Sequence, residues 1–89
     1  MAAVLRVGMD TAGGLIAGPP LVPTVFVNGE PIVVVGTGVA PHGAPPHDAA
    51  AMAAGSELVF AGGLPVCREG DAASCGDKGA PGSANVGAG

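Results

Sequence analysis

The sequence predicts an all-β domain, a small pseudo-threefold body of short β-hairpins closed by pairing of its N- and C-terminal strands. Residues 24–36 and 58–70 share one pattern, which is an apolar strand, a two-residue turn, an X-Pro pair, a second strand and a closing glycine. Fragments of the same pattern stand at the two chain ends, in residues 3–8 and 82–89. Since isolated hairpins expose strand edges, we expect the ends to pair and close the body.

The composition supports a folded domain in spite of its many glycines and prolines. Gly 17 and Pro 9 in 89 residues are typical of disordered chains. The chain is nevertheless 48% hydrophobic and only 11% charged, which excludes a disordered composition. The length predicts one domain over residues 1–89 without an effector extension. A core of Val, Ala and Leu with 2% aromatic residues buries little area, so we expect a metal, a crosslink or a partner to stabilise it.

Charge and hydropathy exclude several function classes. A net charge of −4 with three fixed cations argues against nucleic-acid binding. No apolar run approaches the roughly 18 residues of a membrane span, so we expect no stable membrane insertion. The N-terminus has no secretory signal pattern, which predicts synthesis in the cytoplasm and, if the protein leaves the cell, export by another machine.

The individual elements follow from the repeat. The two complete hairpins turn at Asn28-Gly29 and Gly62-Gly63, residue types that supply the positive φ angles of two-residue turns. The third hairpin forms between the chain ends. Linkers rich in glycine, proline and alanine join the hairpins, and in a threefold body they converge at one end. Within one of them, Asp48–Ala54 is predicted to form a short helical turn with Asp48 as its N-cap.

The linkers carry a candidate metal site. His42 follows the closing glycine of the first repeated hairpin by six residues, and Cys75 follows that of the second by five. Symmetry would bring these side chains together, and the spacer between His42 and His47 can fold back. Two imidazoles and a thiolate suit tetrahedral zinc, with iron as a second possibility. The fourth ligand stays open: Cys67 is one candidate, and water, Asp10 or Asp71 are others.

Other chemistry has little support. The sequence has no nucleophile elbow, phosphate-binding loop or dinucleotide fingerprint, so we predict that the protein is not an enzyme. The carboxylates Asp10, Asp71 and Asp77 are interpreted as solvated loop residues. The alternative function is a free-standing metal-binding or redox module that uses Cys67 and Cys75.

The chain resembles the PAAR-repeat family, the spike-tip proteins of type VI secretion systems and contractile phage tails. The resemblance covers nearly the whole length. It lies in the repeated strand-Asn-Gly-x-Pro-strand-Gly element, in Gly13-Gly14, in the Gly70-Asp71 pair that leads into Ser74-Cys75-Gly76, and in residues 82–86.

The resemblance implies a cone-shaped β fold with a metal, usually zinc, near its apex. On that pattern His42, His47 and Cys75 match ligand positions. Family members usually place a further histidine just before the Gly-Gly pair, where this chain has Ala12. Cys67 is therefore the first candidate for the fourth ligand.

The resemblance also implies partners. The base of the cone would cap the trimeric β-helix of a valine-glycine-repeat spike protein, as a monomer on a homotrimer. Such a tip sharpens the spike for membrane piercing and can carry effector proteins. The sequence does not decide between a secretion system and a phage tail.

Overall fold

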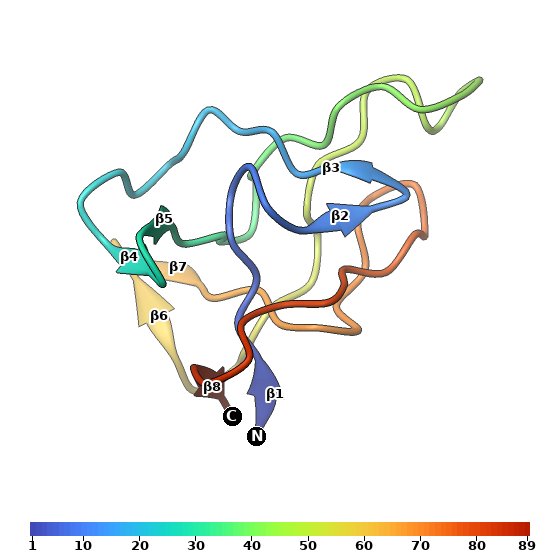
Figure 1. The fold of residues 1–89 in the computed structure, drawn as a ribbon. Coiled ribbons are helices and arrows are strands. Elements are labelled where there is room, and N and C mark those ends of the chain that lie inside the picture. Colours follow the sequence, from blue (N-terminus) through green and yellow to red (C-terminus); the bar gives the residue numbers. More distant parts are fainter.

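The computed structural model describes all 89 residues. It contains eight strands of two residues each and no helix (Figure 1). The strands are β1 (Ala2–Ala3), β2 (Thr11–Ala12), β3 (Gly14–Leu15), β4 (Phe26–Val27), β5 (Glu30–Pro31), β6 (Phe60–Ala61), β7 (Leu64–Pro65) and β8 (Gly87–Ala88). They pair in four antiparallel ladders, β1 with β8, β2 with β3, β4 with β5 and β6 with β7. The predicted all-β fold of short hairpins is confirmed. No helical segment has the length and hydrophobicity to cross a bilayer.

The repeated hairpins turn where the sequence predicts. Asn28 and Gly29 have φ angles of 53° and 84°, and Gly62 and Gly63 have 57° and 80°. These left-handed conformations give the turn a twist that matches the flanking strands. The ladder of β1 with β8 is the third hairpin. It places the two chain ends where the other hairpins have their turns, so the predicted closure of the body is confirmed.

A ring of backbone hydrogen bonds shows the pseudo-threefold symmetry. Leu5 N–H donates to Cys67 O over 3.0 Å, Cys67 N–H to Val33 O over 2.9 Å, and Val33 N–H to Leu5 O over 3.1 Å. Three segments, residues 3–7, 31–35 and 65–69, therefore each pair with both others, and none is left with an open edge. A second ring joins neighbouring positions over 2.7–2.9 Å, from Val7 to Pro31, from Val35 to Pro65 and from Glu69 to Ala3.

Side chains of the three segments alternate between two cores on either side of the ring. Leu5, Val33 and Cys67 are fully buried in one core, together with Met52 and Ile16. The adjacent positions pack in the second core, next to the hairpins: Val4, Ile32, Val34 and Val66. Both faces of these segments are apolar because both are covered, which explains the partial alternation in the sequence.

Each segment ends in a turn that a polar side chain caps. The backbone N–H groups are 2.7–3.2 Å from the capping oxygens, in the pairs Arg6–Asp10, Val34–Thr37 and Arg68–Asp71. Asp10 is fully buried and also accepts hydrogen bonds from the Arg6 side chain and from Gly82 N–H. Burial alone would raise the pKa of Asp10, but these hydrogen bonds lower it below the usual value. The prediction of solvated loop carboxylates is therefore wrong for Asp10, whose charge is compensated inside the fold.

Two segments depart from the sequence prediction. The hairpin of β2 and β3 lies in a stretch interpreted as a linker; it turns at Gly13, whose φ is 82°. Asp48–Ala54 forms no helix, because Ala51 and Met52 are held in β-bridges to Gly38 and Ala73. These long-range bridges outweigh the local helix preference of the alanines.

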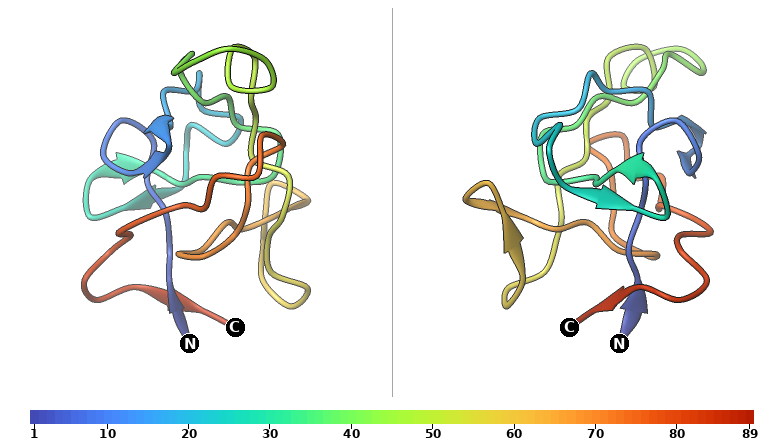
Figure 2. Two further views of the ribbon diagram at one scale, coloured as in Figure 1. Left: turned by 90° about the vertical axis from the view of Figure 1, so that its right-hand side faces the viewer. Right: turned by 60° about the vertical axis from the view of Figure 1, so that its left-hand side comes forward.

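The body has two distinct ends. It measures 33 × 24 × 21 Å along its principal axes. The hairpins β4–β5, β6–β7 and β1–β8 form one end, with both termini among them, and we call this end the base (Figures 1 and 2). The loop around residues 40–50, drawn in green, extends on the opposite side, and with residues 73–77 it forms what we call the apex. The linkers thus gather at one end, as the symmetry requires.

Candidate metal centre

The loop from His42 to His47 is folded back on itself. His42 N–H donates to His47 O over 3.0 Å, and His47 N–H donates to Ala44 O over 2.8 Å. The two imidazole rings therefore lie on the same side of the loop, with their centroids 4.9 Å apart. This confirms the prediction that the proline-containing spacer allows the chain to reverse.

A second tight turn brings in Cys75 and Asp77. Ala73 N–H donates to Asp77 O over 2.8 Å, and Gly76 N–H donates to Ala73 O over 2.9 Å. Gly76 has a φ of 92°, a conformation that glycine adopts without strain. Residues 75 and 77 thereby present their side chains to the two histidines.

One atom from each of these four side chains faces a common point, all within 4.8 Å of one another. His42 Nε2 is 2.8 Å from Asp77 Oδ2 and 3.2 Å from His47 Nδ1, and His47 Nδ1 is 3.1 Å from Asp77 Oδ2. Cys75 Sγ is 3.5 Å from Asp77 Oδ2 and 3.8 Å from His42 Nε2. The structure thus brings His42, His47 and Cys75 together and adds Asp77 to them.

The chemistry of this donor set fits a metal ion. His42 Nδ1 lies 3.0 Å from Ala40 O, so Nδ1–H donates to the carbonyl and the lone pair of Nε2 points at the other three side chains. A carbonyl on the far ring nitrogen is the usual support of a metal-binding imidazole. The lone pair of His42 Nε2 then faces the Asp77 Oδ2 carboxylate oxygen over 2.8 Å, an arrangement that needs a proton or a cation between them. Tetrahedral zinc separates its ligand atoms by roughly 3.3 Å between nitrogens and 3.6 Å between nitrogen and sulfur.

The Gly13-Gly14 pair makes room for the cluster. A Cβ at Gly13 would overlap Asp77 Oδ2 and lie 2.6 Å from His42 Nε2, and one at Gly14 would lie 2.8 Å from His42 Nδ1. Real Cβ atoms essentially never approach within 3.0 Å of another heavy atom. Gly13 is therefore required by the cluster and by its positive φ, and Gly14 by His42 and by the Ala40 carbonyl oxygen, which a Cβ would approach to 2.6 Å.

The cluster is partly exposed, and its charges are coupled. The side chains of His42, His47 and Asp77 are 14%, 35% and 38% exposed. Hydrogen bonds to Ala40 O and to Asp77 raise the pKa of His42 above its usual value. The hydrogen bond from His42, followed by that from Cys75, lowers the pKa of Asp77. Ionised Asp77 therefore favours a positive charge between the imidazoles.

The other candidates for a fourth ligand lie elsewhere. Cys67 is fully buried in the core, and its thiol donates to Ala54 O over 3.3 Å. Asp10 and Asp71 are ion-paired with arginines, with Nε–Oδ2 distances of 3.0 and 2.9 Å. The fourth member of the group is Asp77, which sequence reasoning treated as a solvated carboxylate. The sequence signal that could have identified Asp77 as a member of the cluster is its position two residues after Cys75, with Gly76 between them.

Ala12 occupies the place before the Gly-Gly pair and is fully buried in the core that contains Leu5, Val33 and Cys67, which we call the apical core. It contributes no ligand atom. The cluster therefore draws on two linkers, and the first linker contributes only the space left by its glycines.

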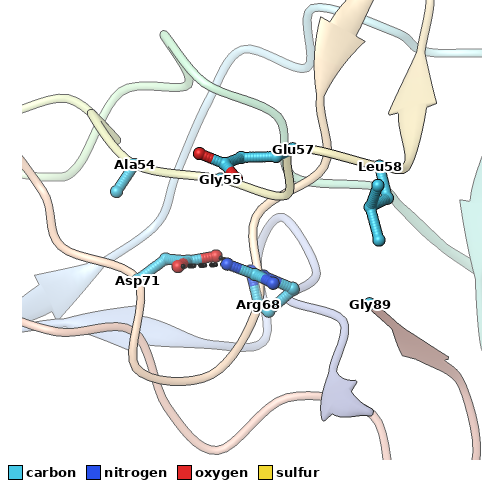
Figure 3. Close-up of a pocket in the computed structure, with 7 residues that line it drawn as sticks. All are labelled: Ala54, Gly55, Glu57, Leu58, Arg68, Asp71 and Gly89. Carbon is cyan, nitrogen blue, oxygen red and sulfur yellow. Dashed lines mark hydrogen bonds and ion pairs between the residues drawn. The ribbon is translucent and has the colours of Figure 1, made fainter.

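The largest concavity of the surface is on the flank of the body. It holds about 340 Å³, and its lining includes Glu57, Leu58 and the Arg68–Asp71 ion pair (Figure 3). None of the four cluster residues lines it. The cluster therefore lies outside this concavity.

Comparison with known proteins agrees with this geometry. A search of curated proteins returned no match. The model of one protein family, the PAAR motif, matches residues 5–80, which include the ring residues Leu5, Val33 and Cys67, the Gly-Gly pair and all four cluster residues. The chain therefore belongs to the PAAR motif family.

Proposed function

We propose that this protein is the tip of a contractile injection machine, and that it caps the β-helix of a trimeric valine-glycine-repeat spike protein. PAAR proteins have a spike-tip role in type VI secretion and related machines. The observation that carries the proposal is the pseudo-threefold base opposite an apex that holds two histidines, a cysteine and an aspartate. A threefold base is the surface that a single chain needs to fit a trimer.

The base carries exposed apolar side chains in equivalent places. Val25, Val59 and Val86 precede the three hairpins and are 37%, 38% and 38% exposed. Phe26 and Phe60 follow the first two of them and are 59% and 56% exposed. Near-equal exposure of the three valines fits a partner that offers the same contact three times. The two aromatic rings add exposed apolar surface that a partner could bury.

The apex has little apolar side chain to bury, and a metal would supply its stability. His42, His47 and Cys75 would hold the ion, with Asp77 beside them. We propose zinc, with iron as the second candidate, because borderline divalent ions accept imidazole, thiolate and carboxylate ligands. Bound there, the ion would join the 42–47 loop to the 75–77 turn. Such a link stiffens a narrow tip that must withstand force during membrane piercing.

The route of the protein follows from this role. We propose that it is made in the cytoplasm and delivered outside the cell, or into a target cell, on the spike. Effector proteins would travel with the same assembly. A secretion system and a phage tail remain equal candidates for the parent machine.

The redox version of the alternative function has little support. Burial, together with the nearby charge of Asp71, raises the pKa of Cys67 to about 12. Its thiol is therefore neither a nucleophile nor a partner for Cys75 near neutral pH. A free-standing metal-binding module stays the competing interpretation, and docking separates it from a spike tip.

The test is a binding measurement between this protein and a trimeric spike β-helix. Replacing Phe26 and Phe60 by Asp should abolish binding without changing the free energy of unfolding, since both rings are exposed. Leu15→Asp is the matched control because Leu15 is 43% exposed and lies next to the apical Gly-Gly pair. Loss of binding by the control alone, or no binding by the native protein to any spike trimer, would overturn the docking proposal.

A further inference from the structure

We infer that Asp77 is the fourth ligand of the apical ion, so that this site consists of two imidazoles, one thiolate and one carboxylate. The inference rests on the proposed metal site and not on docking to a spike. It concerns the residue that supplies the fourth ligand atom, because the first linker has Ala12 where a further histidine would provide one.

The first argument is the position of Asp77 Oδ2. This single oxygen lies 2.8 Å from His42 Nε2, 3.1 Å from His47 Nδ1 and 3.5 Å from Cys75 Sγ. These three distances are shorter, by up to about 0.5 Å, than the ligand-to-ligand separations expected for tetrahedral zinc. The same oxygen is therefore close to all three of the other donor atoms, as a fourth ligand would be.

The second argument excludes a supporting role behind a histidine. A carboxylate that only orients a metal-binding imidazole accepts from the ring nitrogen that points away from the ion. In His42 that nitrogen is Nδ1, and the Ala40 carbonyl already occupies it. Asp77 instead contacts Nε2, the nitrogen that also faces His47 and Cys75. It therefore stands in the ligand shell and not behind it.

The third argument is the space that the first linker leaves open. A Cβ at Gly13 would overlap Asp77 Oδ2, and the preceding residue, Ala12, is buried with no donor atom. The carboxylate of the 75–77 turn thus lies directly against a backbone without a side chain. The observed position of the Asp77 carboxylate therefore requires glycine at position 13.

The donor set determines which ions the site takes. With a thiolate and a carboxylate, two negative charges neutralise a divalent ion, and no net charge remains in the partly buried site. An oxygen donor also disfavours Cu(I), which prefers soft ligands alone. We therefore expect selection of divalent ions that accept mixed nitrogen, sulfur and oxygen ligands, such as Zn²⁺, Fe²⁺ and Co²⁺.

The experiment uses Co²⁺ as the probe, added to the purified metal-free protein under reducing conditions. The native protein should show the visible absorption of tetrahedral cobalt and one thiolate-to-cobalt charge-transfer band. Asp77→Asn should lower the Co²⁺ affinity by at least about tenfold. Asp48→Asn is the matched control, because it removes the same charge from an exposed residue that directly follows the 42–47 loop and is not part of the cluster.

Asp77→Cys separates a ligand from a neighbour. A ligand at position 77 would add a second thiolate to the ion, so the charge-transfer band should grow and Co²⁺ affinity should persist. An unchanged band in a variant that still binds Co²⁺ would overturn the inference and leave the rest of the metal site in place. Failure of the native protein to bind Co²⁺ would instead remove the metal site itself, and docking to a spike would remain to be judged separately.

Discussion

Replacing Gly13 by alanine should uncouple metal binding from folding. Gly13 has a φ of 82°, where a non-glycine residue is strained by about 1–2 kcal/mol. The new Cβ would also lie 2.6 Å from His42 Nε2 and overlap Asp77 Oδ2. Both atoms are at the ends of side chains that can rotate away, so the overlap itself adds little to the loss of stability. Their rotation, however, destroys the geometry that holds an ion.

Gly8→Ala is the matched control for this substitution. Gly8 has a φ of 81°, and a Cβ there would meet no heavy atom within 4 Å. Both variants therefore carry the same backbone strain, and only Gly13→Ala disturbs the cluster. For a domain of this size, 1–2 kcal/mol corresponds to a fall of roughly 4–16 °C in melting temperature.

The assay compares the two variants with and without Zn²⁺. In the presence of chelator, both should melt at the same temperature, below that of the native protein. With Zn²⁺, Gly8→Ala should regain the stabilisation that the native protein shows, and Gly13→Ala should not. Competition with a chromophoric chelator should place the Zn²⁺ affinity of Gly13→Ala at least about tenfold below that of Gly8→Ala. Equal affinities would refute the assignment of the cluster as a metal site shaped by Gly13.

Further predictions concern the ion, the buried charge and the core. Chelation of Zn²⁺ held at about 100 times its dissociation constant should remove roughly 2.7 kcal/mol, a fall of about 10–20 °C in melting temperature, and calorimetry checks this. Asp10→Ala leaves Arg6 without its partner, so urea unfolding should report a loss of about 3–5 kcal/mol. Because folding lowers the pKa of Asp10, its contribution is complete above the usual Asp pKa and is lost as the pH falls through the lower folded value. Native stability should therefore decline below about pH 4, and Asp10→Asn should lack that part of the decline. Leu5→Ala empties a fully buried position in the ring and should cost about 2–5 kcal/mol by urea unfolding; a smaller loss would argue against a close-packed apical core.

Much of the fold followed from the sequence, because its signals are local. Asn28-Gly29 and Gly62-Gly63 require the φ angles of two-residue turns, and the structure has them there. Pairing of the chain ends followed from the need to cover strand edges. The β2–β3 hairpin was missed because two residues on each side of Gly13 give too short a pattern to distinguish from a loop.

The candidate site was predictable only in part. The convergence of His42 and Cys75 followed from their nearly equivalent places after the closing glycines, and that of His47 from the spacer that can fold back. Cys67 was a poor choice for the fourth place because its position in the ring points it into the apical core. A residue's direction within a strand depends on which face the fold covers, and the sequence of a strand with two covered faces does not reveal it.

By itself, the sequence determined the hairpins, the threefold repeat, the family and the linkers in which the imidazoles and the Cys75 thiol lie, because turn chemistry and repetition are properties of neighbouring residues. Only the tertiary structure decided that Asp77 faces the histidines, that Asp10 is buried against Arg6, and that Gly13 is a space for the cluster and not merely a turn. Most of these facts depend on contacts between residues that are far apart in the chain. Gly13 and His42 are 29 residues apart, and the His42–Asp77 and Asp10–Gly82 hydrogen bonds span 35 and 72 residues. The ion pair between Arg6 and Asp10 is local in sequence. The long-range contacts form only when the ring of three segments sets the linkers side by side.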